Sequence, residues 1–192
     1  LVDFDSLEVL KVYDIESKNL IEDFFLGTIN FFVCGPLWKK EFLNKQEGLF
    51  NESLRNGDDW DFNLRMLYQN INLVFLKTAN IQNRVHQNSL SKERNKLNKK
   101  ELISYFNALN LHLKLTKNRK DINADRVSNY VIKRYNIYLL FALRSKNNIH
   151  FFLLKQVLKK QLQLKHYNSF LKTSLGYLLY LPFNKGYKFL KP

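Results

Sequence analysis

The sequence has a single cysteine, Cys34, and it has no apolar run long enough to cross a bilayer. One cysteine excludes an internal disulfide and a metal site built from several cysteines, and it fits a reducing compartment. The longest apolar runs, residues 137–143 and 175–183, fall well short of the roughly 18 residues that a spanning helix needs. With three prolines, six glycines and 45% hydrophobic residues among 192, the composition is that of a globular protein.

The sequence begins without a methionine, and its first residues do not have the pattern of a signal peptide. It begins with leucine, and residues 1–10 have neither a basic start nor a long apolar core. We expect that a segment has been removed upstream of residue 1. We also expect a cytoplasmic location, with peripheral attachment to the inner face of the membrane as a further expectation.

Acidic residues are scarce in the second half of the chain. Residues 1–100 hold 14 Lys and Arg and 14 Asp and Glu, whereas residues 101–192 hold 17 and 3. The net charge of +14 therefore lies in the second half, which indicates binding to phosphate groups of nucleic acid, anionic lipid or a phosphorylated ligand. The alternative is that lysines only solvate helices. We predict two regions, residues 1–98 and 99–192.

The hydrophobic pattern predicts a mixed α/β first region and a helical second region. Alternating or β-rich runs predict strands at residues 8–15, 28–35, 71–77 and 79–86. Helical spacing predicts short helices at residues 20–26, 37–48 and 60–71, and further helices after residue 99. We therefore expect a mixed sheet with flanking helices, followed by an α-helical C-terminal region.

The acidic cluster Asp58, Asp59 and Asp61 stands out in a basic chain. These side chains lie at the predicted start of a helix, where the helix dipole stabilises negative charge, and Asp61 can pair with Arg65 one turn later. That explains two of the three carboxylates. A carboxylate held at a junction of loop and helix can also take a proton from an attacking hydroxyl, so capping and catalysis both remain open.

Four motifs around this cluster resemble the acceptor-side part of family 2 glycosyltransferases, which have the GT-A fold. The motifs are "PLWKKEFL", "GLFNESL", "NGDDWDFNLRML" and "RVHQNSLS", in the order and at the spacing of the family, within residues 28–92. The resemblance implies that residues 1–98 form part of a GT-A-like domain. It also implies that the nucleotide-binding half lies upstream, so that the isolated chain is inactive.

The resemblance implies a role for each residue of the acidic pair. Asp59 corresponds to the general base of the family, and Asp58 stands where the family usually has a supporting Glu. The implied reaction is an inverting transfer of a sugar from a nucleotide-sugar donor to a glycan or lipid-linked acceptor. Such an activity fits the synthesis of a bacterial surface polysaccharide.

The resemblance also implies a metal ion and an acceptor site. Mg²⁺ or Mn²⁺ would be held by an upstream Asp-x-Asp motif together with His86; Asp3 and Asp5 match that motif by letter, but they lie closer to Asp59 than the family places it. Acceptor-binding residues would be the three side chains Trp60, Trp38 and Arg65. The alternatives are core packing for the two tryptophans, a structural ion pair for Arg65 and a structural hydrogen bond for His86.

The basic second region has a pattern of its own. Lys155, Lys159, Lys160, Lys165 and Lys172 alternate with apolar residues, which is typical of a helix at an anionic membrane surface. A solvated helical cap is the alternative reading of this region. Two rival functions for the whole chain are a non-catalytic remnant and a basic nucleic-acid-binding module. The latter leaves the acidic cluster unexplained, because carboxylates repel phosphates.

Overall fold

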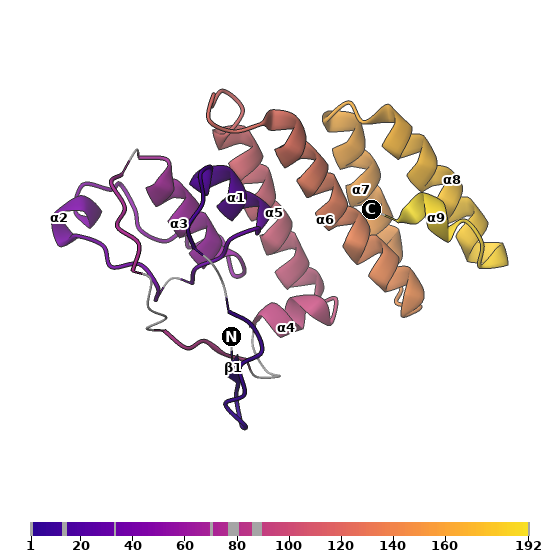
Figure 1. The fold of residues 1–192 in the computed structure, drawn as a ribbon. Coiled ribbons are helices and arrows are strands. Elements are labelled where there is room, and N and C mark those ends of the chain that lie inside the picture. The colour runs from indigo at the N-terminus through magenta and orange to yellow at the C-terminus, as the bar shows by residue number, and fades with distance from the viewer. Residues whose placement is uncertain are drawn as a thin grey trace. The chain divides into compact units, whose positions relative to one another are not determined.

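The computed structural model describes residues 2–12, 15–32, 34–69, 71–76, 81–85 and 90–191, and more than half of these lie in helices (Figure 1). The chain forms two compact units, Leu1–Asn123 and Ala124–Pro192. The predicted helical C-terminal region is confirmed. Each unit is described by itself below.

The first unit begins with short helices joined by irregular chain. Helix α1 (Leu20–Leu26) ends at Gly27, which has a left-handed backbone (φ 69°), as the sequence predicts. Helix α2 is shorter than predicted and covers Lys40–Leu43. Helix α3 (Asp58–Leu67) begins directly after Gly57, and its side chains Phe62, Leu64, Met66 and Leu67 are buried. The predicted helix start at the acidic cluster is thus confirmed.

The larger mixed sheet predicted for the first region is not confirmed among the described residues. They contain a two-stranded parallel sheet of β1 (Val2–Asp3) and β2 (Arg84–Val85), together with a single antiparallel bridge between Val2 and Val9. In two of the predicted strand runs, β-type side chains stay at the surface: Val12 is 73% exposed and Val74 is 88% exposed. Because a strand is stabilised by pairing and by burial of one face, these runs remain irregular.

The two helices that follow complete the first unit. Helix α4 covers Leu90–Asn95, and α5 (Lys99–Leu115) packs against both α3 and α4. The predicted boundary at residues 98–99 therefore falls inside the first unit, between α4 and α5. The reason is that α5 contributes buried polar side chains, among them Ser104 and His112, to contacts with residues 55–68.

The second unit is a series of consecutive helices, each packed on the next (Figure 1). They are α6 (Ala124–Arg144), α7 (His150–Gln163), α8 (Tyr167–Phe183) and α9 (Tyr187–Leu190). In α7 the buried side chains include Leu153 and Val157, while the apolar Phe151 and Leu162 are exposed. The helix carries two apolar rows, and only one of them fits into the core.

The end of the chain folds back onto α8 through two glycines. A Cβ atom at Gly176 would lie 2.9 Å from side-chain atoms of Leu190 and Phe189. Gly186 has a left-handed backbone (φ 84°), and its own Cβ would meet the carbonyl oxygen of Gly176 at 2.9 Å. Side chains at these positions would therefore push α9 away from α8.

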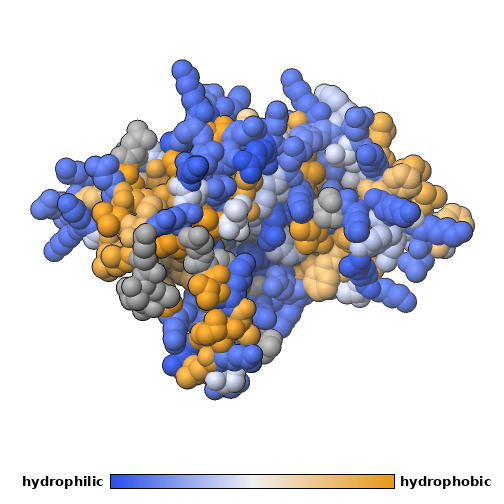
Figure 2. Space-filling view, viewed as in Figure 1, coloured by the Kyte–Doolittle hydropathy of each residue, from blue (hydrophilic) through white to orange (hydrophobic). Residues whose placement is uncertain are grey.

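Among the described residues, no helix combines the length and apolarity needed to cross a membrane. Apolar side chains nevertheless reach the surface in several places, next to hydrophilic ones (Figure 2).

Candidate functional site

The acidic cluster is positioned by a turn that requires glycine. Gly57 has φ 84°, and a Cβ added there would lie 3.5 Å from Cβ of Ala108 on α5. Its carbonyl oxygen accepts the backbone N–H of Asp61 at 2.8 Å, which closes the first turn of α3. The neighbouring backbone N–H groups of Arg55 and Asn56 donate to Oγ of Ser104, at 2.8 Å and 3.0 Å. Helix α5 therefore fixes the loop from which α3 starts.

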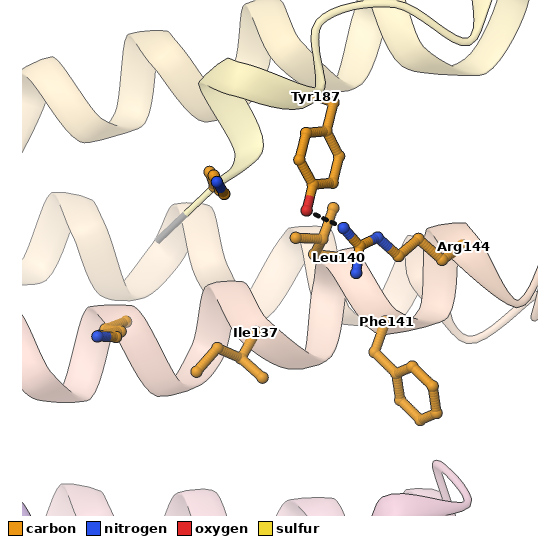
Figure 3. Close-up of a pocket in the computed structure, with 7 residues that line it drawn as sticks. Ile137, Leu140, Phe141, Arg144 and Tyr187 are labelled. Carbon is orange, nitrogen blue, oxygen red and sulfur yellow. Dashed lines mark hydrogen bonds between the residues drawn. The ribbon is translucent and has the colours of Figure 1, made fainter.

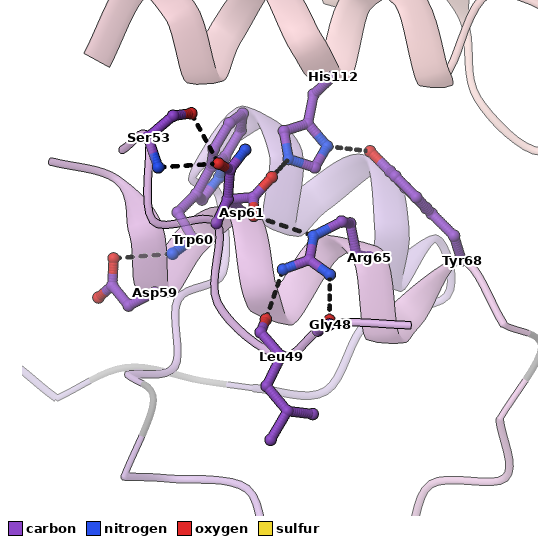
Figure 4. Close-up of polar contacts among 10 residues, drawn as sticks. Gly48, Leu49, Ser53, Asp59, Trp60, Asp61, Arg65, Tyr68 and His112 are labelled. Atoms are coloured by element: carbon purple, nitrogen blue, oxygen red, sulfur yellow. Dashed lines mark hydrogen bonds and ion pairs between the residues drawn. The ribbon is translucent and has the colours of Figure 1, made fainter. Parts of the chain in front are cut away.

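Asp61 is the most enclosed carboxylate of the cluster, with none of its surface exposed. It accepts hydrogen bonds from Nε of Arg65 at 2.9 Å and from Nε2 of His112 at 3.0 Å (Figure 4). Burial alone would raise the pKa of Asp61, but the hydrogen bonds from His112 and Arg65, together with the positive charge of Arg65, outweigh it and lower the pKa below its usual value. The predicted ion pair of Asp61 with Arg65 is confirmed.

The network continues from His112 to Tyr68 at the end of α3. Nδ1 of His112 lies 2.8 Å from the hydroxyl oxygen of Tyr68. Burial lowers the pKa of His112, so the ring is neutral at pH 7; it donates from Nε2 to Asp61 and accepts the Tyr68 hydroxyl proton at Nδ1. Burial also raises the pKa of Tyr68, which keeps that proton in place. This enclosed network holds α3 and α5 together.

Arg65 extends the network to a loop before α3. Its remaining guanidinium nitrogens donate to the carbonyl oxygens of Gly48, at 2.9 Å, and Leu49 (Figure 4). Nε and both Nη atoms of Arg65 therefore donate hydrogen bonds within the protein. These bonds fit the structural alternative for Arg65. Its contact with an acceptor stays a prediction.

Asp59 differs from Asp61 although it is only two residues away. It is half-buried, and no ion pair joins it to another described residue; its Oδ1 accepts the backbone N–H of Trp60 at 2.7 Å. Burial, followed by the negative charge of Asp58, raises the pKa of Asp59, although the Trp60 N–H and the charge of Arg94 act against this. A carboxylate of raised pKa is a stronger base.

Arg94 connects the cluster with the chain that follows the motif "RVHQNSLS". It lies on α4, its Nη1 donates to Oδ1 of Asn56 at 3.0 Å, and its guanidinium stacks on the ring of Tyr105 at 4.4 Å. The positive charge of Arg94 acts on Asp59. The third sequence motif and the chain that follows the fourth are thereby brought to one place in the first unit.

The two tryptophans lie in aromatic clusters. Trp60 donates from Nε1 to the carbonyl oxygen of Phe24 at 3.4 Å and meets the ring of His112 edge-on at 4.8 Å. Trp38 stacks on Phe42 at 5.5 Å and meets Phe62 edge-on at 5.9 Å. Both indoles are half-buried, which fits the packing alternative. Acceptor binding by either indole stays a prediction.

The residues considered for metal binding do not assemble among the described ones. His86 lies outside the described residues. Oδ1 of Asp3 accepts hydrogen bonds from the backbone N–H groups of Asp5 and Ser6, at 3.0 Å and 2.9 Å, and from the Ser6 hydroxyl. These bonds form a local turn of residues 3–6. Within the described part of the chain, no three His, Cys, Asp or Glu side chains are grouped to hold a metal ion. Binding of Mg²⁺ or Mn²⁺ with His86 therefore stays a prediction.

Sequence reasoning missed the network around Asp61. Its partner His112 comes 51 positions later on another helix, and nothing local in the sequence shows that the two side chains meet. A signal was present, because a histidine in an apolar helical stretch needs a hydrogen-bonding partner when it is buried. Asn63 was also missed: it is fully buried, and its amide has no hydrogen-bond partner among the described residues.

The second unit contains a separate pocket of about 440 Å³ between α6 and α9 (Figure 3). Its apolar lining is Ile137, Leu140 and Phe141 of α6. The polar lining comprises Arg144, whose guanidinium donates to the hydroxyl of Tyr187, together with Lys133 and Lys191. No acidic side chain lines this pocket, so it suits a molecule that carries both a negative charge and an apolar part.

Comparison of the chain with family models, curated proteins and solved structures gives no match.

Proposed function

We propose that the first unit activates the acceptor in an inverting glycosyl transfer, with Asp59 as the general base. The observation that carries this proposal is the contrast between two carboxylates in one helical turn. The environment of Asp61 lowers its pKa, whereas the environment of Asp59 raises its pKa. Neighbouring carboxylates with pKa values shifted apart are typical of a site in which one group is kept for proton transfer.

The proposed step needs only the partly exposed Asp59 carboxylate. It takes the proton of an acceptor hydroxyl, whose oxygen forms a bond to the anomeric carbon of the donor sugar. The bond from that carbon to the nucleoside diphosphate breaks, and its electron pair leaves with the diphosphate. Because the acceptor attacks from the opposite face, the configuration of the anomeric carbon inverts. Asp59 afterwards releases the proton to solvent.

The other residues of the site position Asp59. Asp58 raises the pKa of Asp59 by its negative charge, and the buried bonds of Asp61 to His112 and Arg65 fix the first turns of α3. No described residue is assigned to the donor nucleotide. The expectation of Mg²⁺ or Mn²⁺ rests on the family resemblance, and the proposal routes no step through a metal ion.

The resemblance to family 2 glycosyltransferases supports the same conclusion. The motifs "NGDDWDFNLRML" and "RVHQNSLS" are distant in sequence, yet the chain following the second brings Arg94 close enough to act on Asp59. A nucleotide-sugar donor and a glycan or lipid-linked acceptor, in surface polysaccharide synthesis, are the substrates that this resemblance implies. The GT-A arrangement is likewise part of the proposal.

The test replaces Asp59 by Asn in the gene of the source organism and analyses its surface glycans by mass spectrometry. We expect Asp59→Asn to lose the same sugar as a deletion of the gene, with a normal protein level. Asp58→Asn is the matched control, because it removes one carboxylate beside Asp59, and we expect it to retain part of the transfer. A normal glycan with Asp59→Asn would contradict the proposal.

A deletion that leaves every glycan unchanged would favour the non-catalytic alternative. Sugar binding can then be tested on the purified chain, which has only two tryptophans. The two indole N–H signals of Trp38 and Trp60 in an NMR spectrum report on α2 and on the start of α3. We expect acceptor sugars to shift the Trp60 signal in the wild type.

A further inference from the structure

Helix α8 of the second unit exposes a continuous apolar face. Five large apolar residues recur at intervals of four, four, three and three, and each is between 47% and 67% exposed. They are Tyr167, Leu171, Leu175, Leu178 and Leu181. Because a helix turns once in 3.6 residues, these side chains lie along one side of α8.

The opposite side of α8 is already occupied. Thr173, Gly176 and Tyr177 are buried there, and the hydroxyl of Tyr177 lies 2.8 Å from Nδ1 of His150 on α7. The exposed face is therefore additional to the one that builds the unit. Single exposed leucines are ordinary on protein surfaces, whereas a row of five on one helix indicates a binding surface.

The charges around this face are mainly positive. The second unit has 13 Lys and Arg but a single acidic residue, Asp125, and no Asp or Glu follows it in the sequence. Lys172 is exposed on α8 itself, and Lys165 and Lys185 are exposed just outside its two ends. Asp125 lies near Tyr167 at the first turn of α8. An apolar face flanked mainly by cations is complementary to a surface that is both apolar and negatively charged.

The pocket between α6 and α9 has the same combination of chemistry. Its apolar lining and its cations, Lys133, Arg144 and Lys191, would suit an anionic headgroup attached to a hydrocarbon chain (Figure 3). Two separate features of the second unit thus fit the same class of partner.

We propose that the second unit binds an anionic lipid bilayer, with the exposed face of α8 lying at the boundary of headgroups and acyl chains. Lysines beside that face would contact lipid phosphates. A second copy of the chain fits less well, because it would bring two strongly positive units together. Nucleic acid would satisfy the cations but would leave the row of leucines without an apolar partner.

The test measures binding of the full chain to vesicles by co-sedimentation. Vesicles of phosphatidylcholine mixed with phosphatidylglycerol are compared with vesicles of phosphatidylcholine alone. We expect binding to the anionic vesicles, and we expect the double variant Leu171→Gln and Leu178→Gln to weaken it by about tenfold or more. Both replaced side chains are well exposed, so the fold should be retained, which circular dichroism checks.

The matched control makes the same two changes in the first unit. Leu37 is 95% exposed and Leu76 is 62% exposed, so the variant Leu37→Gln and Leu76→Gln removes as much exposed leucine. We expect this variant to bind anionic vesicles like the wild type. Equal loss in both double variants would overturn the assignment to α8.

Other outcomes would also overturn the proposal. In one such outcome, high salt removes vesicle binding and the Leu171 and Leu178 variant binds like the wild type. The protein would then adsorb electrostatically to the vesicle, without insertion of α8. In another, the chain does not bind vesicles, and it forms a dimer that is lost in the Leu171 and Leu178 variant. The face would then be a contact between copies of the chain. RNA binding that depends on these leucines, without vesicle binding, would assign the face to nucleic acid.

This proposal does not depend on glycosyl transfer. Vesicle binding concerns residues of the second unit, whereas the glycan test concerns Asp59 in the first. Failure of one test therefore leaves the other proposal standing.

Discussion

The two units differ in whether their buried polar side chains carry charge. In the first unit, the buried polar side chains include the carboxylates Glu22, Asp61 and Glu101. Glu101 pairs with Nε of Arg55 at 2.9 Å, and Glu22 accepts the backbone N–H of Asn123 at 2.6 Å. In the second unit, buried polar side chains such as Asn136, Gln161 and Thr173 are uncharged.

Ionisable groups therefore stabilise the fold in the first unit, whereas in the second unit we expect them to bind a partner. Buried ion pairs in the first unit tie together segments that are distant in the sequence, and removing one member leaves a charge without a partner. Buried polar groups described in the second unit form neutral hydrogen bonds, and exposed lysines such as Lys165, Lys172 and Lys185 lie at its surface, where a negatively charged partner can reach them. The contrast can be tested by changing one buried group at a time.

The largest effect is expected from Asp61→Ala in the first unit. This change leaves the guanidinium of Arg65 and the ring of His112 without their common acceptor. We expect the free energy of unfolding to fall by about 3–5 kcal/mol, measured by urea denaturation. Asp58→Ala is the control, since Asp58 is partly exposed and forms no ion pair with another described residue. Similar losses in the two variants would break the contrast.

A smaller effect is expected from acid. The pKa of His112 is lowered by burial, so below its usual value of 6.5 the unfolded chain binds a proton that the folded chain does not. The free energy of unfolding should therefore fall with decreasing pH, by up to about 1.4 kcal/mol per pH unit, until the lowered pKa is reached. We expect a flatter profile for His112→Gln. An unchanged slope in that variant would show that other groups cause the acid sensitivity.

The smallest effect is expected in the core of the second unit. Gln161 is fully buried and donates to the hydroxyl of Thr173 at 2.9 Å, while its Oε1 has no partner among the described residues. Replacing both by apolar residues, Gln161→Leu with Thr173→Val, should change the free energy of unfolding by no more than about 1 kcal/mol. A loss as large as that of Asp61→Ala would mean that both units depend equally on buried polar groups.

Local chemistry allowed several elements to be predicted from the sequence. Gly27 ends α1, Gly57 precedes α3, and the pair of Asp61 with Arg65 spans one helical turn. Each depends on residues within a few positions of one another. The helices after residue 99 follow from strong periodicity, although the buried row of α7 could not be chosen because the helix has two apolar rows.

Contacts between distant segments could not be predicted. The predicted sheet required partners for residues 8–15 and 71–77, and β-type composition alone does not supply them. The bonds of His112 to Asp61 and of Ser104 to residues 55–56 join α5 to α3 and to the loop before it, some fifty positions earlier. These bonds place α5 in the first unit, which the distribution of charge along the sequence did not indicate.

The central claim is that Asp59 and Asp61 are held in opposite ways, one for proton transfer and the other for the fold. The most direct test is an NMR titration of their side-chain carboxyl carbons in the full chain. The account predicts a pKa above the usual value of 3.8 for Asp59 and a pKa below it for Asp61. Equal pKa values, or a lowered pKa at Asp59, would contradict the claim.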